Sequence, residues 1–358
     1  MHAHIGGVLG MVALLAGACS FPVAQNPSPG PSHSSQASRV IPTTSPTPSA
    51  SPLRGHIVYV RRAGGSDTPG VIWVMRADGT GDSMLTDGEN PAVSPHGRRI
   101  AFTDSYGIRI HVINLDGSSP AELTDGGVLP QGYSGGDGGP AWSYDGTRIA
   151  FIRTHIPTAD SDGVYVINAD GSGIHRVSDN NRAFRPAWLA NDQGIAFEAL
   201  EDPSAASYHF VIAAVNPDGS NRRLLFSVPG LNTFGPVVAP DGLHYAFTVS
   251  PDCPGCSSPS KCQIMVAGSD MRPVQVTHER PLQLPSIDPS IAASLGIPIL
   301  TVTVGDQCAE APSWSPDSTK LVFDDTLSIS VINADGSDRQ LILRSSEGFD
   351  SQPVWIAA

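Results

Sequence analysis

The feature of the sequence that most restricts its fold is a pattern that returns six times. Each return opens with a proline and a short apolar run, as in PAWSYDG and PSWSPDS. Repeats of roughly 40–45 residues are typical of β-propeller blades, and loops inserted into a blade lengthen the spacing. The pattern therefore predicts six propeller blades. The opening prolines are Pro91, Pro140, Pro186, Pro236, Pro312 and Pro353, which by subtraction are 49, 46, 50, 76 and 41 residues apart.

The residues after each opening predict the other strands of a blade. A β-rich run such as TRIAFIRT follows, then a second such as GVYVINADG, and then a short edge-like piece such as AELTDG. These runs are rich in Val, Ile, Phe and Tyr, and tetrads such as NADG place Asp-Gly where a tight hairpin needs positive φ. With 37 Gly, 32 Pro and 15% charged residues, the composition also favours short strands. We expect an all-β fold, a six-bladed β-propeller of four-stranded antiparallel blades.

These motifs resemble those of a known family. The combination PxWSPDGxxIAF followed by VxNADG resembles the WD-repeat-like repeat of the TolB family of six-bladed propellers, and the resemblance covers residues 55–358. It implies the same propeller fold for this region. TolB proteins carry an α/β domain ahead of the propeller, whereas a Pro/Ser-rich stretch stands in that place here. The resemblance therefore does not extend to a role in the Tol envelope system.

The two ends of the repeat region complement each other. The region starts with GHIVYVRR, VIWVMRADG and DSMLTDG, three runs without an opening proline piece, and it ends with PVWIAA, which lacks the other three. Pairing of the two ends completes one blade and removes two open sheet edges. We expect the C-terminal strand to close the ring.

The N-terminal residues carry the pattern of export and tethering. Ile5 to Ala18 form an apolar run of signal-peptide length, too short to span a bilayer. The run ends in LLAGACS, which resembles the lipobox of bacterial lipoproteins and implies a signal peptide over residues 1–19 and acylation of Cys19, as with palmitate. Ala16 and the lack of Lys or Arg near the start depart from the lipobox pattern, so a plain secretory signal stays open.

Residues 20–54 are rich in Pro, Ser and Thr and have too few apolar side chains to pack. Such a composition is typical of unfolded chain, so we expect a stalk between the acylated cysteine and the propeller. The protein is then expected to be exported and lipid-anchored in the cell membrane or envelope, facing outside the cytoplasm.

The cysteines after Cys19 all fall around one blade. In an exported protein an even set predicts two disulfides. Connections between second and third strands and connections between blades emerge on the same side of a propeller, so we expect one disulfide to tie Cys308 to the loop from Cys253 to Cys262. A four-thiolate zinc site, suggested by CPGC, is the alternative, although the later spacing is irregular. The four are Cys253, Cys256, Cys262 and Cys308.

Candidate catalytic residues lack the context that their chemistry needs. Ser134 lies in GYSGG, which matches the GxSxG nucleophile pattern, but it falls in a Gly-rich connection between blades with no helix after it. Asp87, Asp125 and Asp179 recur after fourth strands and could hold a cation at a channel mouth, although turns also favour Asp there. We expect no catalytic residue, metal or cofactor. The aromatic side chains of the repeats are expected to pack between blades: Trp142, Trp188, Trp314, Phe102, Phe151 and Phe323.

Charge and loop placement indicate a binding function. The net charge of −13, with 21 Lys and Arg against 34 Asp and Glu, argues against nucleic acid. We expect a monomeric, non-catalytic propeller that recognises a protein, peptide or glycan; the alternatives are a metal-assisted lyase or hydrolase acting at the channel mouth, or a sensor or spacer. Long connections, including residues 125–139 and 280–304, fall on one face, where we expect the partner to dock. Residues 280–304 could equally plug the channel.

Overall fold

The computed structural model contains a folded unit that spans Ser51–Ala358. Among the residues singled out in the sequence, Cys19, Cys253, Cys256, Cys308, Asp179 and the segment 280–304 lie outside the described residues. The described ranges are 53–64, 68–126, 134–156, 162–178, 183–201, 209–251, 262–277, 309–325, 328–344 and 349–357.

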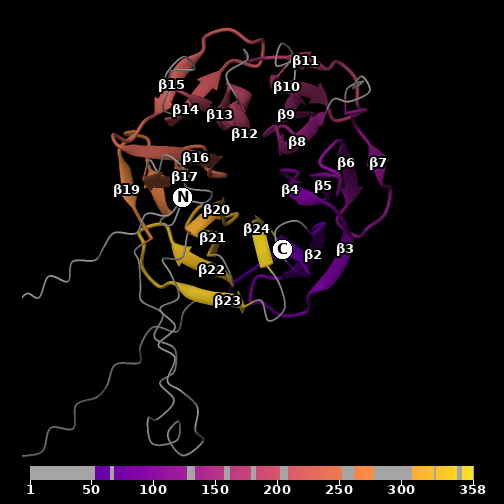
Figure 1. The fold of residues 1–358 in the computed structure, drawn as a ribbon. Coiled ribbons are helices and arrows are strands. Elements are labelled where there is room, and N and C mark those ends of the chain that lie inside the picture. The colour runs from indigo at the N-terminus through magenta and orange to yellow at the C-terminus, as the bar shows by residue number, and fades with distance from the viewer. Residues whose placement is uncertain are drawn as a thin grey trace, which may run out of the picture. The chain divides into compact units, whose positions relative to one another are not determined.

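Six four-stranded antiparallel sheets are arranged around a central channel, with one strand of each sheet innermost (Figure 1). This arrangement confirms the six-bladed propeller predicted from the repeat. Blade 1 contains β24 (Phe349–Ile356) innermost, then β1 (His56–Arg62), β2 (Val71–Arg76) and β3 (Ser83–Asp87). Blade 2 contains β4 (Glu89–Val93), β5 (Arg99–Thr103), β6 (Ile110–Asn114) and β7 (Ala121–Glu122). Blade 3 contains β8 (Ser134–Trp142), β9 (Arg148–Ile156), β10 (Gly163–Asn168) and β11 (His175–Arg176).

The other three blades repeat this order. Blade 4 contains β12 (Phe184–Trp188), β13 (Ile195–Leu200), β14 (Phe210–Val215) and β15 (Arg223–Phe226), with the 3₁₀ turn η1 (Ala190–Asp192) between β12 and β13. Blade 5 contains β16 (Leu231–Val238), β17 (Tyr245–Pro251), β18 (Gln263–Ala267) and β19 (Pro273–Gln275). Blade 6 contains β20 (Ala309–Trp314), β21 (Lys320–Asp325), β22 (Ser328–Asn333) and β23 (Gln340–Arg344).

The C-terminal strand closes the ring, as the sequence predicts. β24 pairs antiparallel with β1, with His56 opposite Ile356 and Arg62 opposite Phe349. Arg61 Nε also lies 2.9 Å from the buried Asp350 carboxylate, so an ion pair joins the first and last strands. The last strand of the chain therefore serves as the innermost strand of the first blade.

The tight hairpins have the conformation predicted from their Asp-Gly pairs. Gly117, Gly171, Gly219 and Gly336 adopt φ values of 82–88°. In each of these turns the preceding aspartate accepts hydrogen bonds from the backbone N–H and the hydroxyl of a serine two residues later, at 2.6–2.9 Å. Asx turns of this kind fix the turn and leave the strand register unambiguous.

Hydrophobic clusters between neighbouring blades form the core. Trp188 of blade 4, for example, packs in one cluster with Ile152 and Val164 of blade 3. The six repeat aromatics predicted to lie between blades each belong to such a shared cluster. Since each cluster uses apolar side chains of two blades, no blade buries its faces alone.

The expectation of one long Gly-rich connection up to residue 139 is wrong for its last part. Ser134–Gly139 belong to β8 and continue its pairing with β9, with Gly136 opposite Thr154. The glycines allow a close approach that side chains would prevent, because an added Cβ at Gly136 would lie 2.5 Å from Ile108 Cα of blade 2. The composition of residues 134–139 therefore favours a loop, but these residues form a strand that packs against the neighbouring blade.

Candidate binding site at the channel mouth

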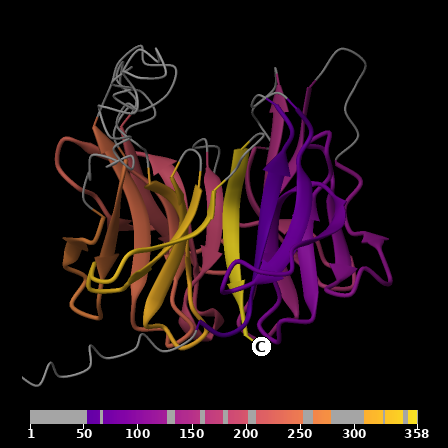
Figure 2. The same ribbon diagram turned by 90° about the horizontal axis from the view of Figure 1, so that it is seen from below.

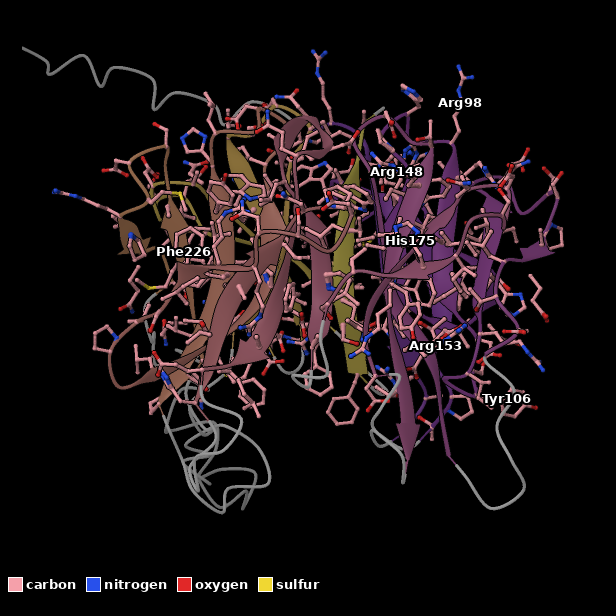
Figure 3. All side chains as sticks on the ribbon, turned by 90° about the horizontal axis from the view of Figure 1, so that it is seen from above. Arg98, Tyr106, Arg148, Arg153, His175 and Phe226 are labelled. Atoms are coloured by element: carbon pink, nitrogen blue, oxygen red, sulfur yellow. The ribbon has the colours of Figure 1, made fainter. Side chains whose placement is uncertain are left out.

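The two ends of the propeller differ in their connections. Figure 3 places Arg98, in the β4–β5 turn, and Tyr106, in the β5–β6 turn, at opposite ends of the blades. The end that carries the β4–β5 turn and its equivalents is called here the tight-turn end. The end at which the β5–β6 turn and the equivalent connections of the other blades leave the strands is called the loop-rich end. Figure 2 shows the blades from the side, with the C-terminus at the tight-turn end.

A ring of six left-handed residues surrounds the channel. Each is the residue immediately before the proline that opens a blade, and each innermost strand has a register shift there. This conformation is unusual before proline, which favours extended backbone at the preceding residue. The sequence offers one signal for it, because two of the six residues are glycine. The six are Asn90 (φ 49°), Gly139 (58°), Arg185 (45°), Gly235 (57°), Ala311 (45°) and Gln352 (53°).

A cavity of about 700 Å³ lies at the loop-rich end of the channel. Its aromatic lining comes from three strands of blades 4 and 5: Phe184, Phe210 and Phe234. The Phe210 ring centroid lies 6.3 Å from that of Phe184 and 5.5 Å from that of Phe234. Phe184 is 39% exposed. The cavity has the size of a ligand pocket and an aromatic side open to solvent.

Beside this cavity, the carboxylate of Glu198 contacts both Arg185 of its own blade 4 and the backbone of blade 5. Arg185 Nη1 lies 3.4 Å from Glu198 Oε1, and the same carboxylate oxygen accepts a hydrogen bond from the Gly235 N–H at 2.7 Å. Glu198 is buried, and burial raises its pKa, while Arg185 and Gly235 N–H favour the charged carboxylate. The Arg185 side chain itself is 58% exposed, since it faces the channel. Glu198 therefore positions both the guanidinium and the backbone of the next blade.

Two further acids face this arginine from blade 6. Glu310 lines the cavity and stands directly opposite Asp324 in the β20–β21 ladder. Burial, followed by the negative charge of Glu310, raises the pKa of Asp324 to about 8. Asp324 Oδ1 is buried and has no hydrogen-bond partner among the described residues. The negative charges of Glu198, Glu310 and Asp324, from blades 4 and 6, all raise the pKa of Arg185.

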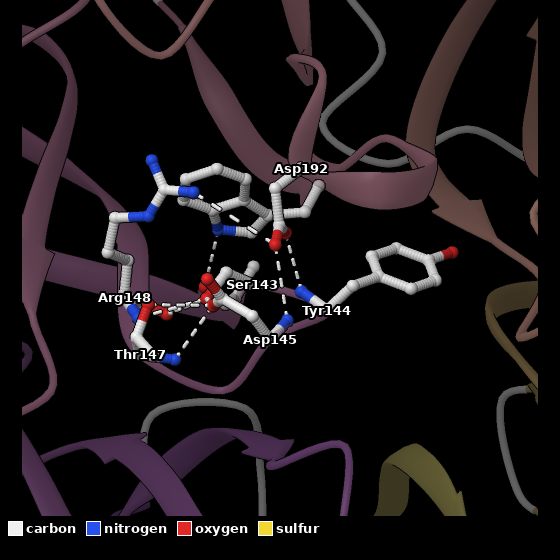
Figure 4. A network of polar contacts seen from close by, with 8 residues as sticks. Ser143, Tyr144, Asp145, Thr147, Arg148 and Asp192 are labelled. Atoms are coloured by element: carbon white, nitrogen blue, oxygen red, sulfur yellow. Dashed lines mark hydrogen bonds and ion pairs between the residues drawn. The ribbon is translucent and has the colours of Figure 1, made fainter.

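The tight-turn end of the channel has a different lining. A second cavity of about 700 Å³ is lined there by the six opening prolines and by Tyr144. The Tyr144 hydroxyl donates to the Ala239 carbonyl oxygen at 2.9 Å, which joins blade 3 to blade 5. Figure 4 shows the Tyr144 and Asp145 N–H groups donating to the Asp192 carboxylate, at 2.6 and 3.2 Å. Tyr144 is therefore held in place at this mouth.

The structure separates most of the residues singled out in the sequence. Cys262 is buried beside the loop-rich cavity, with Sγ 3.4 Å from Glu310 Oε1, and the disulfide pairing stays a prediction because its three candidate partners are not described. Asp87 ends β3, an outermost strand, and Asp125 follows β7 with its carboxylate 3.7 Å from Arg153. Ser134 begins β8. The sequence reasoning missed Arg185, Glu198, Glu310 and Asp324, because no local motif joins residues of different blades.

The described ranges contain neither a candidate metal site nor a helix that could span a membrane. In these ranges no three His, Cys, Asp or Glu side chains are grouped so that they could hold a metal ion. No helix among the described residues has the length and apolar character needed to cross a membrane.

The ring of six blades and the cavity at its loop-rich mouth define a channel-bearing β-propeller. No protein-family model matches the chain. A TolB homologue of Chlorobium luteolum is 31% identical over 111 residues, a stretch that covers 30% of this chain and only 22% of the relative. TolB from Acinetobacter baumannii superposes with a TM-score of 0.60 at 17% identity, over 84% of this chain and 66% of that one.

A chain from the nidogen/laminin complex superposes with a TM-score of 0.58 at 12% identity, over 84% of this chain and 97% of that one. At these identities the superpositions show the fold. Together with the sequence match, they show that the six-bladed β-propeller of this chain is similar to the propeller of TolB.

Proposed function

We propose that the protein is a non-catalytic binding propeller that recognises a protein partner at the loop-rich mouth of its channel. The observation that carries this proposal is the cavity lined by Phe184, Phe210 and Phe234 beside the charged groups of Arg185, Glu198 and Glu310. Aromatic and arginine side chains in a concave, partly open site are typical of the residues that dominate protein interfaces.

The two channel mouths differ in a way that favours the loop-rich one. At the tight-turn mouth Tyr144 is fixed by its hydrogen bond to Ala239 and by Asp192. At the loop-rich mouth the exposed Phe184 and the channel-facing Arg185 offer side chains to an incoming ligand. The partner is therefore proposed to approach from the loop-rich end.

Two observations favour a protein partner over a peptide or a glycan. The structural relative from the nidogen/laminin complex comes from an assembly of proteins, and a rigid ring with long connections at one end offers a broad docking surface. The alternative of a metal-assisted lyase or hydrolase gains no support from the described residues, where no group of three metal-ligating side chains is found.

We propose in addition that the protein is exported and anchored through an acyl chain on Cys19. The support is the LLAGACS sequence after an apolar run of signal-peptide length. Cells grown with an alkyne analogue of palmitate should label the wild-type chain, and Cys19→Ala should lose the label and move from the membrane to the soluble fraction. A Cys19→Ala chain that stays labelled and membrane-bound would exclude this anchor.

Site-specific photo-crosslinking in intact cells tests the binding face. A benzoylphenylalanine at Tyr106, which is 84% exposed at the loop-rich end, should crosslink one discrete protein. The same probe at the exposed Arg98, at the tight-turn end, should give no such product. The proposal fails if the product forms from Arg98 and not from Tyr106, or if neither position yields a protein adduct.

A further inference from the structure

The cavity at the tight-turn end contains a single charged side chain. Among the described residues that line it, only Arg185 is charged, and none is an Asp, Glu, Lys or His. The other lining residues are apolar or uncharged, and most of them belong to the innermost strands of the six blades. Concave apolar sites with a few well-placed polar groups are typical of small-molecule binding. This composition favours a ligand with an apolar body and one anionic group.

The ring of left-handed residues lies where the two channel cavities meet. All six of its members line the tight-turn cavity, and Asn90, Gly139 and Arg185 line the loop-rich cavity as well. Gln352 and Asn90 bind each other, because Gln352 Nε2 donates to Asn90 Oδ1 at 3.1 Å and the Asn90 N–H donates to Gln352 Oε1 at 2.8 Å. Gly139 and Gly235, the neighbours of Arg185 around the ring, have no side chain. The arginine therefore has room within the channel.

The Arg185 guanidinium has donors to spare. Within the described part of the chain its one hydrogen bond runs from Nη1 to Glu198 Oε1, at 3.4 Å. A guanidinium carries several N–H donors in one plane, and their spacing matches the two oxygens of a carboxylate. The side chain is 58% exposed, and the negative charge of Glu198 above all raises its pKa, so the group stays protonated. Arg185 is therefore accessible to a bound anion.

An anion is expected to reach Arg185 from the tight-turn side. Glu198 and Glu310 line the loop-rich cavity, where their charges repel a carboxylate. Neither of these acids lines the tight-turn cavity. The charge of an anionic ligand is therefore complementary to the lining of the tight-turn cavity and opposed by that of the loop-rich one.

Tryptophan rings and the six opening prolines give the tight-turn cavity apolar walls. Three of its four tryptophans use their indole N–H for a backbone carbonyl, so they offer mainly ring carbon to a ligand. These bonds run from Trp142 to Ala92 at 3.2 Å, from Trp188 to Ala141 at 3.1 Å and from Trp355 to Arg54 at 2.9 Å. An alkyl chain or flat ring placed here removes apolar surface from water on both molecules.

We propose that the tight-turn cavity binds a small apolar monocarboxylate. Its carboxylate accepts hydrogen bonds from the Arg185 guanidinium, and its alkyl or aryl body packs against the tryptophans and prolines. Tyr144 is already held at this mouth by Ala239 and Asp192, so little ordering is needed on binding. This site lies at the other end of the channel from the proposed protein-binding face and does not depend on that function.

Isothermal titration of the full chain with octanoate tests the carboxylate contact. Acetate has the same charge without the chain, and 1-octanol has the chain without the charge. Wild type should bind octanoate at least about tenfold more tightly than 1-octanol and should show no measurable binding of acetate. Arg185→Gln should bind octanoate at least about tenfold more weakly, because it loses a charge-assisted contact, and should keep its affinity for 1-octanol.

Arg98→Gln is the matched control. It removes the same charge from an exposed position at the tight-turn end that lies outside the cavity lining, and it should change octanoate affinity less than twofold. Thermal melting checks that each variant is folded. If Arg185→Gln does not fold, Arg185→Lys decides, since it keeps a positive charge beside Glu198 without the planar fork. Weaker octanoate binding with unchanged 1-octanol binding supports the site, and unchanged octanoate binding refutes it.

Tryptophan fluorescence locates the ligand. Four of the five tryptophans line the tight-turn cavity, and none lines the loop-rich cavity among the described residues. Bromine quenches an indole that it contacts, so 8-bromooctanoate should quench the fluorescence of wild type, and octanoate should reverse the quenching by competition.

Four outcomes would overturn the inference. It fails if octanoate does not bind, or if wild type binds octanoate and 1-octanol equally. It also fails if Arg185→Gln and Arg98→Gln weaken octanoate binding by the same factor. Octanoate binding without quenching by 8-bromooctanoate would place the ligand outside the tight-turn cavity.

Discussion

The backbone N–H of Gly235 donates to the carboxylate of Glu198 at 2.7 Å. A buried acid of blade 4 therefore holds β16, the innermost strand of blade 5. The same oxygen lies 3.4 Å from Arg185 Nη1. One carboxylate therefore links the stability of two neighbouring blades to the position of the channel arginine. Mutation of Glu198 should disturb the fold and the site together.

Glu198→Ala should lower the free energy of unfolding by about 1–3 kcal/mol, because it leaves the partly buried Gly235 N–H without its acceptor. Urea unfolding followed by circular dichroism measures the change. Glu201→Ala is the control, since the Glu201 side chain is 54% exposed and its pair with His209 should contribute less than about 1 kcal/mol. Equal losses of unfolding free energy for the two variants would show that the contacts of Glu198 stabilise the fold no more than an exposed ion pair does.

Asp324 makes stability depend on pH. Its pKa is raised from 3.8 to about 8, so the folded protein keeps a proton on this carboxyl group that the unfolded chain releases at lower pH. The free energy of unfolding therefore falls as pH rises from about 4 to about 8. Asp324→Asn removes this loss and should raise the melting temperature at pH 9 by about 4 °C or more.

At pH 5 the gain of Asp324→Asn should shrink, because the wild-type carboxyl group is then protonated in the folded protein. Thermal melts of both chains at pH 5 and pH 9 test this. The same difference at both values of pH would mean that the Asp324 carboxyl group does not titrate in the predicted range.

Two repeat tryptophans should respond differently to the same change. The Trp188 indole N–H donates to the Ala141 carbonyl oxygen at 3.1 Å, whereas Trp314 Nε1 is buried without a partner among the described residues. Both rings pack between blades, so Trp→Phe removes similar apolar area at each site. Trp188→Phe should therefore cost about 1 kcal/mol more than Trp314→Phe, the usual net contribution of one hydrogen bond. A larger loss at Trp314, measured by urea unfolding, would contradict this.

The sequence predicts the fold well because each blade repeats the same local signals. The Asp-Gly pairs define hairpins, the apolar runs define strands, and the unmatched ends define the closing pair between β24 and β1. The Gly-rich stretch before Pro140 is misread because glycine lowers strand propensity, and only the approach to Ile108 of blade 2 explains its place in β8. That approach is a tertiary contact that no local pattern contains.

The candidate site is harder to predict than the fold. Arg185, Glu198, Glu310 and Asp324 are single charged residues in otherwise ordinary repeats, and the chain separates Glu198 from Glu310 by 112 positions by subtraction. They approach one another only because blades 4 and 6 flank blade 5, in which Gly235 leaves space at the channel. The bulge in each innermost strand likewise determines the left-handed conformation of the residue before the opening proline. A residue before proline ordinarily favours extended backbone, so the sequence alone predicts the wrong conformation.

The affinity for the protein that crosslinks from Tyr106 is the most direct test of a binding site at the loop-rich mouth. Titration of that partner should give at least tenfold weaker binding for Phe184→Ala, which truncates the exposed aromatic side of the cavity. Leu243→Ala, at a residue 56% exposed in the β16–β17 turn of the tight-turn end, should bind within twofold of wild type. Unchanged affinity for Phe184→Ala together with a large loss for Leu243→Ala would place the binding site at the opposite end of the propeller.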